Sequence, residues 1–593
     1  MAPEHKARRR TKQVVVLVIV LVAVLSVLAY LVWFVLLPYV EEITPGKDRA
    51  DLRSVLGLSG PEDAFVMLGE YPSSSKAVVR GGTVYWDYNS VERHFTDLFW
   101  MNMDEGILLY TTADEVVRAD DGESFYVRHA EAAPADGIAP EKVRTDMPVF
   151  FIERGRGYIS LDFALQFSNF KYEFFKDPYR VQIYAWDAVF ESAEVINDTA
   201  VRRSFDIKSE IISDLSMGDV VYIMNKSSEW SKVRTKDALT GYVENKDLAE
   251  ASFKTEIVIP QDYVPPPYTA LTEDRRLCLA WHQVTVADAN AYLYDMIETA
   301  WPLDVVSPTW FKVTDEFGNI ESIAWESYVE NAHARGLAVW PLVDDFIYFD
   351  DPAQRVTLLM STDSRNRFVG YMIAQAKELG FDGINLDFEV VPLEAASGFE
   401  QLVRELSVAC RAHGLVFSID NYPPRPHTEH YNRKLQGEVA DYVIIMGYDE
   451  HWGTSSGAGS VASLPFVVDA IEQTLAVVPA NKTMNAVPFY SRLWATTIDT
   501  GELRIDAVPG LGWQQKWLSE RSIEPEWDEE LGQNYAEYVR KGVLYQIWLE
   551  DGDSMQTRLD AMEVFDLGGV AAWRLGLEKP ETWDIIGAWT RGG

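Results

Sequence analysis

Residues Phe381–Glu389, FDGINLDFE, alternate strictly between two kinds of side chain. In an extended strand, where successive side chains point to opposite faces, one face carries only glycine and polar groups: Gly383, Asn385, Asp387 and Glu389. The other face is apolar: Ile384, Leu386 and Phe388. This combination is expected for a barrel strand, whose outer face packs on helices and whose inner face ends at an active site. A half-buried strand with a solvated acidic face is the alternative that the stretch alone leaves open.

Short apolar runs of this kind recur from Arg275 to the end of the chain and alternate with helix-like segments. That rhythm indicates a parallel sheet with crossover helices. Eight such units over about 320 residues predict an α/β fold of the TIM (β/α)8 barrel type. The runs are Leu277–Gln283, Val305–Trp310, Leu337–Val343, Gly383–Glu389, Val416–Asn421, Tyr442–Tyr448, Thr483–Phe489 and Gly569–Arg574.

Several motifs, in order along this region, resemble glycoside hydrolase family 18, the chitinase group. DGINLDFE resembles the DxxDxDxE signature of that family, Met446–Asp449 (MGYD) its MxYD motif, and Trp573 the tryptophan at the end of its eighth strand. Four further motifs are similar to the spore-cortex and cell-wall branch: SPTWF, VPFYSRLW, IWLED and VAAWRLG. Several ordered motifs are more specific than any one of them, so the active-site interpretation of the strand is favoured.

The resemblance implies a substrate-assisted, retaining cleavage of a β-linked N-acetyl-hexosamine glycan. Glu389 would protonate the leaving oxygen and later act as base, which requires a raised pKa; burial and the neighbouring Asp387 both raise it. Asp387 would orient the acetamido N–H, Tyr448 would hydrogen-bond its carbonyl, and Trp573 would stack under the sugar. The remaining candidates for substrate binding are Asn385, Met446, Asp449, Trp310, Tyr490 and Arg492. Glu550 and Asp551 are candidates for the rim that the sequence does not decide.

Asn385 departs from the family pattern, which has an aspartate at the middle position of the signature. That aspartate shares a proton with the residue at Asp387 during the family's cycle. An amide donates a hydrogen bond but carries no charge, so the cycle loses one titrating partner. We expect a shifted pH profile rather than an inactive protein, and Asn385→Asp is expected to move that profile.

The N-terminal part contains 24 residues without a charge, Val14–Leu37, about 36 Å long as a helix and enough to span a bilayer. The preceding MAPEHKARRRTK carries five Lys/Arg and one Glu. The positive-inside rule places the N-terminus in the cytoplasm and the rest outside the cell. A cleaved signal peptide is the alternative; its apolar core would be shorter, and no A-x-A-like site follows this one. We therefore expect a tail at 1–12 and an anchor at 13–40.

Between anchor and barrel we expect two small modules and a linker. Residues 41–190 contain a strand–helix–strand–turn–strand pattern twice, at Thr83–Thr112 and Tyr158–Ala185, and resemble the N-terminal domain of copper amine oxidases without a metal-binding His cluster. Residues 191–252 resemble a bacterial SH3-like domain, all-β and often a cell-wall contact in that family, with a plain spacer as the alternative. Pro260 and the PPP triplet make 253–270 an extended linker before the 271–593 barrel.

Composition limits the remaining possibilities. The chain has 593 residues and a net charge of −38, which argues against nucleic-acid binding. Neither of its two cysteines, Cys278 and Cys410, has a metal-binding or disulfide-like spacing, and we expect no metal and no cofactor. Peptidoglycan is the expected partner. A chitin-like glycan, a non-catalytic sugar-binding barrel and a surface scaffold are the alternatives.

Overall fold

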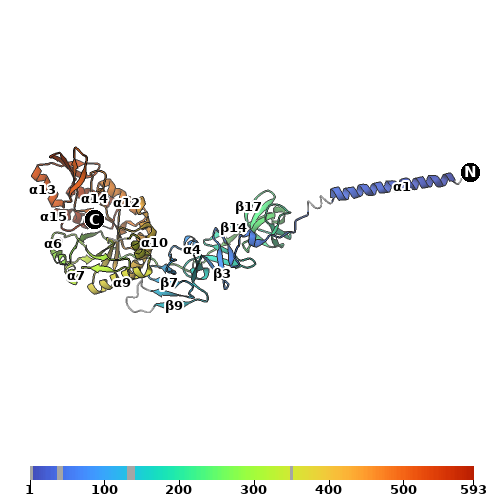
Figure 1. Ribbon diagram of the computed structural model, residues 1–593, viewed down its shortest axis with the longest axis horizontal. Helices are drawn as coiled ribbons and strands as arrows, with labels where there is room; N and C mark the ends of the chain where they lie inside the picture. The colour runs from blue at the N-terminus through green and yellow to red at the C-terminus, as the bar shows by residue number, and fades with distance from the viewer. Residues whose placement is uncertain (1–3, 37–43, 130–139, 347–350, 593) are drawn as a thin grey trace. The chain divides into compact units, whose positions relative to one another are not determined.

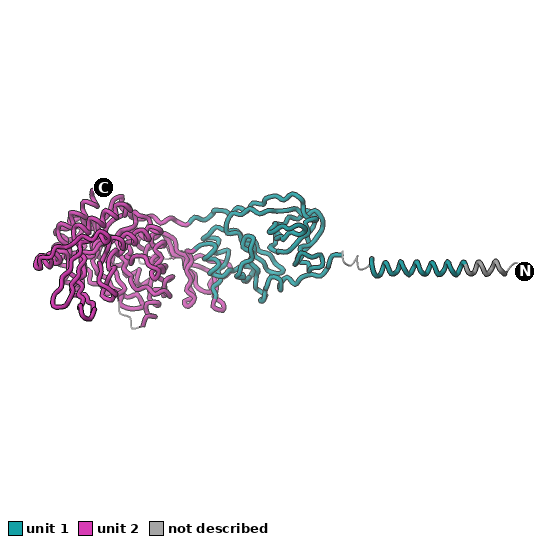
Figure 2. The backbone as a smooth tube through the Cα atoms, turned by 90° about the horizontal axis from the view of Figure 1, so that it is seen from above, with its two compact units in different colours: residues 1–96, 156–264 teal, residues 97–155, 265–593 magenta. Residues whose placement is uncertain are grey.

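The structure is a computed structural model that describes residues 4–36, 44–129, 140–346 and 351–592. The chain forms two compact units, shown in different colours in Figure 2. One unit combines Met1–Thr96 with Arg156–Val264, and the other combines Asp97–Gly155 with Pro265–Gly593. The predicted stalk at 41–190 is therefore divided between the two units.

The N-terminal helix α1 (Glu4–Tyr30) continues as the π-helical segment η1 (Leu31–Leu36). Its stretch Gln13–Val35 is 23 residues long, apolar enough to cross a membrane, and buried nowhere against the rest of the protein. One apolar helix of spanning length is thus confirmed. The last residues of the predicted span, 37–40, lie outside the described residues, and the helix begins at Glu4, inside the predicted tail.

The first unit contains an α+β sheet with strand order β11-β4-β3-β1-β13-β12 and β2 beside β1. The predicted repeat is confirmed as secondary structure, since β4–α4–β5–β6 and β11–α5–β12–β13 follow the same order. The strands of this sheet and the helices beside them are β1 (Asp63–Leu68), β2 (Tyr71–Pro72), β3 (Ala77–Arg80), β4 (Thr83–Asp87), α4 (Tyr88–His94), β11 (Arg156–Ser160), α5 (Leu161–Ala164), β12 (Lys171–Phe175) and β13 (Arg180–Tyr184). The short helix α3 (Leu52–Val55) packs instead on the core of the all-β region of the same unit.

Seven antiparallel strands complete this unit in the order β16-β15-β19-β18-β17-β14-β20. They are β14 (Ala188–Glu194), β15 (Thr199–Arg202), β16 (Ile211–Leu215), β17 (Val220–Lys226), β18 (Trp230–Arg234), β19 (Thr240–Glu244) and β20 (Phe253–Ile257), with the short helix η2 (Asn245–Asp247). The region is all-β, and its SH3-like assignment stays a prediction. The first residues of the predicted linker, Phe253–Ile257, form the extended strand β20 and pair with β14 in this sheet.

The second unit begins with an antiparallel meander: β5 (Phe99–Asn102), β6 (Ile107–Thr111), β7 (Val116–Asp120), β8 (Phe125–His129) and β9 (Glu141–Arg144), followed by β10 (Phe150–Glu153). This sheet docks on the barrel helices of the same unit. Gln401 Nε2 donates to Thr111 Oγ1 at 2.9 Å, and Asn102 Nδ2 donates to the Met360 carbonyl at 2.9 Å. The first copy of the repeat therefore ends in a hairpin that belongs to the barrel unit.

Eight parallel strands close into a barrel in the order β21-β35-β29-β28-β27-β26-β25-β22, with β22 pairing back to β21. They are β21 (Leu277–His282), β22 (Val305–Val313), β24 (Ala338–Val339) with β25 (Leu342–Asp344), β26 (Gly383–Asp387), β27 (Val416–Asn421), β28 (Tyr442–Ile445), β29 (Thr483–Pro488) and β35 (Gly569–Trp573). All eight predicted runs are confirmed, and the predicted TIM barrel is present. A short strand, β23 (Ile320–Ser322), pairs antiparallel with β22.

Helices cover the outside of the barrel (Figure 1). They are η3 (Ala287–Tyr292), α6 (Leu293–Ile297), α7 (Glu326–His333), α8 (Ala353–Met360), α9 (Thr362–Leu379), η4 (Leu393–Ala395), α10 (Ala396–Ala412), η5 (Pro426–Tyr431), α11 (Arg433–Val439), α12 (Leu464–Leu475), η6 (Ala480–Lys482), α14 (Gly552–Val564) and α15 (Pro580–Arg591). Ile384, Leu386 and Phe388 are buried in the core between strands and helices. The outer face predicted for this strand is therefore confirmed.

A second sheet interrupts the barrel between β29 and β35, and the sequence reading did not predict it. Its strands are β30 (Leu493–Thr497), β31 (Leu503–Ala507), β32 (Glu526–Asp528), β33 (Gln533–Arg540) and β34 (Val543–Trp548), packed with α13 (Leu511–Arg521). The motifs VPFYSRLW and IWLED, taken from the resemblance, continue into this insertion. The period-two pattern of its strands resembles that of any half-buried strand, so the pattern alone does not separate insertion from barrel.

Candidate active site

Strand β26 delivers its polar face to the inside of the barrel. Gly383 begins the strand where a Cβ atom would lie 2.6 Å from the Val416 carbonyl oxygen and 2.7 Å from the Trp340 ring, so only glycine fits. Asn385 is fully buried (0% exposed), and Asp387 is 6% exposed at the strand end. The side chains that the alternation placed together are thus stacked along the barrel axis, with the acids nearest the opening.

The acids open into a cleft of about 770 Å³ at the C-terminal end of the strands. Seven of the predicted site residues line it: Asp387, Glu389, Met446, Tyr448, Asp449, Tyr490 and Trp573. An adjoining cavity of about 430 Å³ shares Asp387 and Trp573 with the cleft and is lined by Trp310. The two cavities adjoin at Asp387 and Trp573.

Three predicted substrate-binding residues lie differently from expectation. Asn385 lies beneath the cleft and is enclosed by protein, so its position is one of support rather than contact. Trp310 is 1% exposed, and its indole Nε1 donates to Asn290 Oδ1 at 2.7 Å, which makes it mainly a core residue. Arg492 stands behind Asp449, to which its guanidinium is paired at 2.7 Å.

The backbone at Glu389 is held from two sides. Its N–H donates to Asp345 Oδ1 at 2.9 Å, and the next N–H, of Val390, donates to Asp345 Oδ2 at 3.3 Å. The Tyr431 hydroxyl donates to the Glu389 carbonyl at 2.7 Å. Arg355 Nη1 pairs with Asp345 at 2.8 Å and so fixes the carboxylate that holds the strand end. These contacts position the Glu389 carboxyl without occupying it.

Burial raises the pKa of Glu389 to about 7. The Tyr422 hydroxyl donates a hydrogen bond to this carboxyl and lowers the pKa, while the charges of Asp345 and Asp449 raise it. A carboxyl with a pKa near 7 is partly protonated at neutral pH and is able to give a proton and later to take one. The raised pKa expected for the general acid is therefore present at Glu389.

Asp387 is prepared to accept a hydrogen bond. Burial, followed by the charges of Asp420 and Glu389, raises its pKa well above the usual range for an aspartate. Its Oδ1 atom is buried and accepts no hydrogen bond from any residue that the structure describes. Buried polar atoms are almost always paired in folded proteins, so an unpaired carboxylate oxygen in a cleft favours a ligand N–H or O–H as its partner.

Tyr448 and Tyr490 form the opposite wall of the cleft. Their rings meet edge to face at 6.3 Å, and burial raises the pKa of both hydroxyls well above the usual range, which keeps them protonated donors. The Tyr490 hydroxyl donates to Asp449 Oδ1, and Arg492 pairs with the same atom. Asp449 is thus held by two protein groups, which fixes the loop that follows β28.

The structure adds residues that the sequence reading did not select. Asp420, Tyr422 and Trp281 line the cleft, and Asp345 accepts the backbone N–H of Glu389. The signal was present, because Asp420 and Tyr422 end the fifth predicted strand as Trp281 ends the first. A position at a strand end does not by itself show whether a side chain lines the cleft. That depends on how the neighbouring strands pack.

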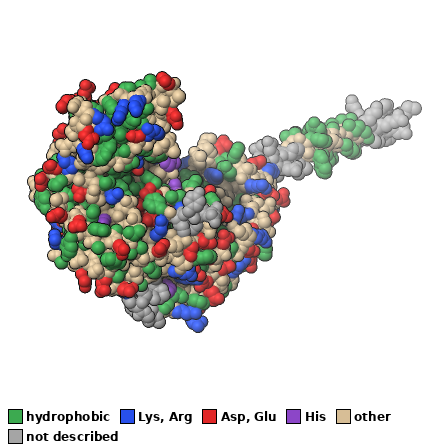
Figure 3. Space-filling view, turned by 60° about the vertical axis from the view of Figure 1, so that its left-hand side comes forward, with side chains coloured by type: hydrophobic (Ala, Val, Ile, Leu, Met, Phe, Trp, Pro, Cys, Tyr) green, Lys and Arg blue, Asp and Glu red, His purple; other side chains and the backbone are tan. Residues whose placement is uncertain are grey.

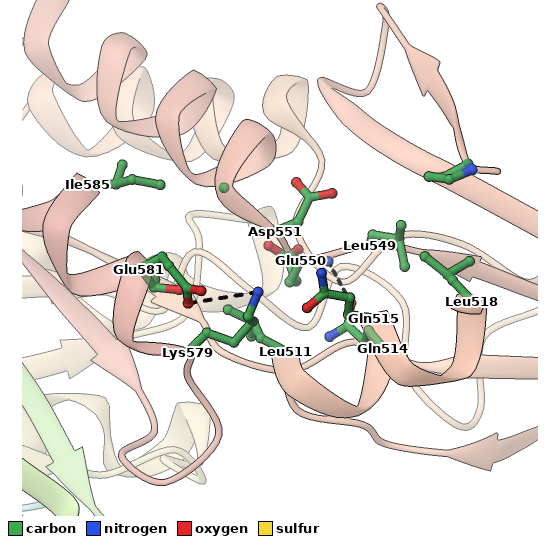
Figure 4. Close-up of a pocket in the computed structure, with 13 residues that line it drawn as sticks. Leu511, Gln514, Gln515, Leu518, Leu549, Glu550, Asp551, Lys579, Glu581 and Ile585 are labelled. Atoms are coloured by element: carbon green, nitrogen blue, oxygen red, sulfur yellow. Dashed lines mark hydrogen bonds and ion pairs between the residues drawn. The ribbon is translucent and has the colours of Figure 1, made fainter. Parts of the chain in front are cut away.

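Glu550 and Asp551 do not reach this cleft. Glu550 is buried and paired with Arg558 through two bonds of 2.6 and 2.7 Å, and Asp551 caps α14 through the Ser554 N–H at 3.0 Å. Both lie beside a separate cavity of about 200 Å³, shown in Figure 4. Their roles are structural, which answers the question that the sequence left open.

Removing the Tyr422 hydroxyl tests the electrostatics of Glu389. Because its hydrogen bond lowers the pKa of Glu389, Tyr422→Phe is expected to raise that pKa. The protonated acid then persists to higher pH, and the alkaline limb of the kcat/KM profile is expected to move upward in pH. The measurement is a pH–rate profile of both proteins on the same glycan; a limb that stays in place would contradict the assignment of Glu389 as the acid.

Residues 351–578 match the family Glycosyl hydrolases family 18. The match includes β26 to β35 and so contains the acids, the tyrosines and Trp573. The chain contains a family 18 glycoside hydrolase domain. The family 18 domain, recognised first by the ordered motifs, is thus confirmed independently of the geometry of its cleft.

Curated relatives of the family 18 domain come from Bacillus species and from animals. The chain is 26% identical over 248 residues to the cortical fragment-lytic enzyme of Bacillus subtilis (strain 168), covering 40% of this chain and 56% of that enzyme. It is 25% identical over 272 residues to the uncharacterized glycosylase YvbX of the same organism, covering 44% and 76%. The chain thus spans little more than half the length of the first of these relatives.

Two solved structures align with part of this chain. The spore cortex-lytic enzyme SleL of Bacillus cereus aligns over 56% of this chain and 76% of its own, at 18% identity and a TM-score of 0.48. The C-terminal domain of a putative chitinase from Desulfitobacterium hafniense DCB-2 aligns over 54% and 100%, at 20% identity and a TM-score of 0.47.

Proposed function

We propose that this protein hydrolyses β-linked N-acetyl-hexosamine glycan by substrate-assisted, retaining catalysis, with peptidoglycan as its substrate. The observation that carries the proposal is the pair of acids in one cleft. Glu389 has a pKa of about 7, and Asp387 presents a buried oxygen without a partner among the described residues. A proton donor beside an acceptor for an acetamido N–H is the arrangement that this chemistry needs.

The proposed steps assign one role to each group. Glu389 gives its proton to the glycosidic oxygen while the acetamido carbonyl oxygen of the same sugar attacks C1, breaking the glycosidic bond and forming an oxazolinium. Asp387 accepts the acetamido N–H and stabilises the positive charge, and the Tyr448 hydroxyl donates to the acetamido oxygen. Water then attacks C1 as the bond from C1 to the acetamido oxygen breaks, which restores the acetamido group. Glu389 takes the proton of that water, and the configuration at C1 is retained.

Trp573 is placed to support the reacting sugar. It ends β35, lines both cavities and lies 5.8 Å from the Trp281 ring. An indole face beside the acids offers an apolar platform for a sugar ring. Met446 lines the same cleft and adds apolar surface. Among the described residues, no group of three or more His, Cys, Asp or Glu side chains is arranged to hold a metal ion.

Peptidoglycan is proposed over chitin because of the context of the domain. The relatives named as cortical fragment-lytic enzymes favour a wall glycan. The apolar helix α1, preceded by a basic tail, favours a single-pass anchor with the N-terminus in the cytoplasm and the family 18 domain outside the cell. An SH3-like module at 191–252 would add a contact to the wall.

Acidic side chains are spread over the face shown in Figure 3, which is consistent with solubility outside the cell rather than with nucleic-acid binding.

The test is hydrolysis by the full chain in detergent micelles. Purified peptidoglycan and chitin oligomers are each incubated with the protein, and the products are identified by mass. New reducing N-acetylglucosamine ends from peptidoglycan are expected, with slower release from chitin oligomers. Faster cleavage of chitin would favour a chitinase, and binding of either glycan without any product would favour a sugar-binding protein.

A further inference from the structure

Asn385 is the centre of a closed hydrogen-bond network inside the barrel. Its carbonyl oxygen accepts from Trp281 Nε1 at 2.9 Å and Ser307 Oγ at 3.3 Å, and its amide nitrogen donates to Ser418 Oγ at 3.1 Å and Asp420 Oδ1 at 2.8 Å. Both oxygen lone pairs and both N–H groups are thus used. The Asn385 amide therefore has no unpaired hydrogen-bonding position through which a proton could be exchanged. One of its N–H groups donates to the Asp420 carboxylate.

That carboxylate lies beside Asp387. Strands β26 and β27 run parallel in the register Asn385↔Ser418 and Leu386↔Ile419. Asp387 and Asp420 are the next residues on the two strands, so they are neighbours across a strand spacing of about 4.8 Å. Both belong to the inward-facing set, both line the cleft, and they are 6% and 3% exposed. Two nearly buried carboxyl groups therefore lie on neighbouring strands and line the same cleft.

Adjacent buried carboxyl groups do not both ionise, because each charge opposes the other in a medium that solvates neither. We propose that Asp420 is the proton-sharing partner of Asp387, taking the part that the amide at Asn385 is unable to play. This inference rests on the proposed function for its place in the cycle, and on the strand register and the network of Asn385 for its geometry.

The proton balance of the pair is simple. In the free protein one proton is shared between Asp387 and Asp420. When the acetamido N–H binds Asp387, that carboxylate must be ionised to accept it and to oppose the positive oxazolinium, so the proton resides on Asp420. After the product leaves, the proton is shared again, and none is gained or lost. Asn385, donating to Asp420, orients the carboxyl through both states.

Most of the other titratable groups around the pair are acids and phenols. They are Glu389 after β26, Asp344 and Asp345 on and after β25, Tyr422 after β27, and Tyr448, Asp449 and Tyr490 elsewhere in the cleft. Lys312 and His427 line the same two cavities. Three nearby arginines are paired with other acids: Arg355 with Asp345, Arg492 with Asp449, and Arg425 with Asp469. The surrounding charge therefore strengthens the need for the pair to hold a proton.

Exchanging the two side chains tests the proposal. Asp420→Asn is expected to lower kcat about tenfold and to move the acidic limb of the kcat/KM profile to lower pH, because Asp387 then ionises without a neighbouring acid. The double variant Asn385→Asp/Asp420→Asn returns a carboxylate to the network and is expected to recover most of the lost kcat. A purely structural role of Asp420 would not be rescued by this exchange.

Ser418→Ala is the matched control, since it removes another bond of Asn385 without moving a carboxylate. Its pH profile is expected to keep the wild-type limbs. If Asp420→Asn leaves kcat and the acidic limb unchanged, or if the folded double variant recovers nothing, Asp420 is not the partner of Asp387.

Thermal unfolding of the full chain against pH separates this inference from the proposed function. Asp420 has a raised pKa in the folded state. It therefore destabilises the folded protein increasingly as pH rises above its pKa in the unfolded chain, about 3.9. The Tm of Asp420→Asn minus that of the wild type is therefore expected to increase as pH rises. The same difference is expected to be smaller when both proteins also carry Asp387→Asn. If the Tm changes of the two substitutions are coupled but the protein cleaves no glycan, the pairing of Asp420 with Asp387 is upheld and the proposed function is overturned. If the Tm changes are additive and the protein is active, only the pairing is overturned.

Discussion

Glu389→Gln is expected to lower kcat on the glycan substrate about 10³-fold, the largest effect of any single side chain in the cleft. Glutamine keeps the shape of the side chain and accepts the same hydrogen bond from Tyr422, but it has no proton to give to the leaving oxygen. Because burial raises the pKa of Glu389 to about 7, wild-type activity is expected to fall as pH rises above that value. The variant is expected to bind the glycan with an affinity near that of the wild type.

Glu450→Gln is the control for this experiment. Glu450 lines the same cleft, and its carboxylate accepts the Ser463 N–H at 2.9 Å, away from the strand end that carries the acids. Its replacement is expected to change kcat far less than Glu389→Gln does. Initial rates measured over pH 4 to about 9 compare the two variants with the wild type. A Glu389→Gln protein that retains more than about a tenth of kcat would remove Glu389 from the role of acid.

The second large effect is expected for stability. Arg365 is fully buried and binds Glu405 through two bonds of 2.9 and 3.2 Å, while its Nη1 donates to the Leu359 carbonyl at 2.8 Å. Its guanidinium also lies 4.3 Å from the Trp100 ring of the docked meander. Arg365→Met is expected to lower the free energy of unfolding by about 3–5 kcal/mol, because it leaves Glu405 as a buried charge without its cation.

Chemical denaturation of the full chain, monitored for the barrel unit, measures this loss. The double variant Arg365→Met/Glu405→Leu removes both charges and is expected to recover part of the stability. Lys516→Met, which breaks an exposed pair with Glu520, is expected to have a much smaller effect. Hydrogen exchange in residues 97–155 is expected to rise in Arg365→Met. Equal losses in the single and double variants would show that the charges are not the cause.

Much of the barrel was predictable because its signals are local. An apolar run, the turn residues around it and a period of two are properties of neighbouring residues, so all eight strands were found in order. The same alternation placed Asn385, Asp387 and Glu389 on one face and left Ile384 and Leu386 for the helices. The apolar helix α1 was visible for the same reason, since length and composition alone define it.

The failures share a different cause. The meander at 97–155 is recognisable as strands, but its membership in the barrel unit depends on Arg365 and Gln401, more than 200 residues away in sequence. The insertion of β30 to β34 has the pattern of ordinary strands, and only their pairing with one another separates them from the barrel. Trp310 was selected by its position at a strand end, while packing against Tyr328 buries its ring.

By itself the sequence determined the strand that carries the acids and the kind of barrel that contains it, and it suggested the chemistry that we propose for Glu389 and Asp387. Only the tertiary structure decided what the amide at Asn385 does and which acid stands beside Asp387. The alternation of side chains is a property of one strand, whereas the register of β26 on β27 is set by the packing of the whole barrel. That register brings Asp420, 33 residues beyond Asp387 in the chain, beside Asp387, the residue that we propose accepts the acetamido N–H of the substrate.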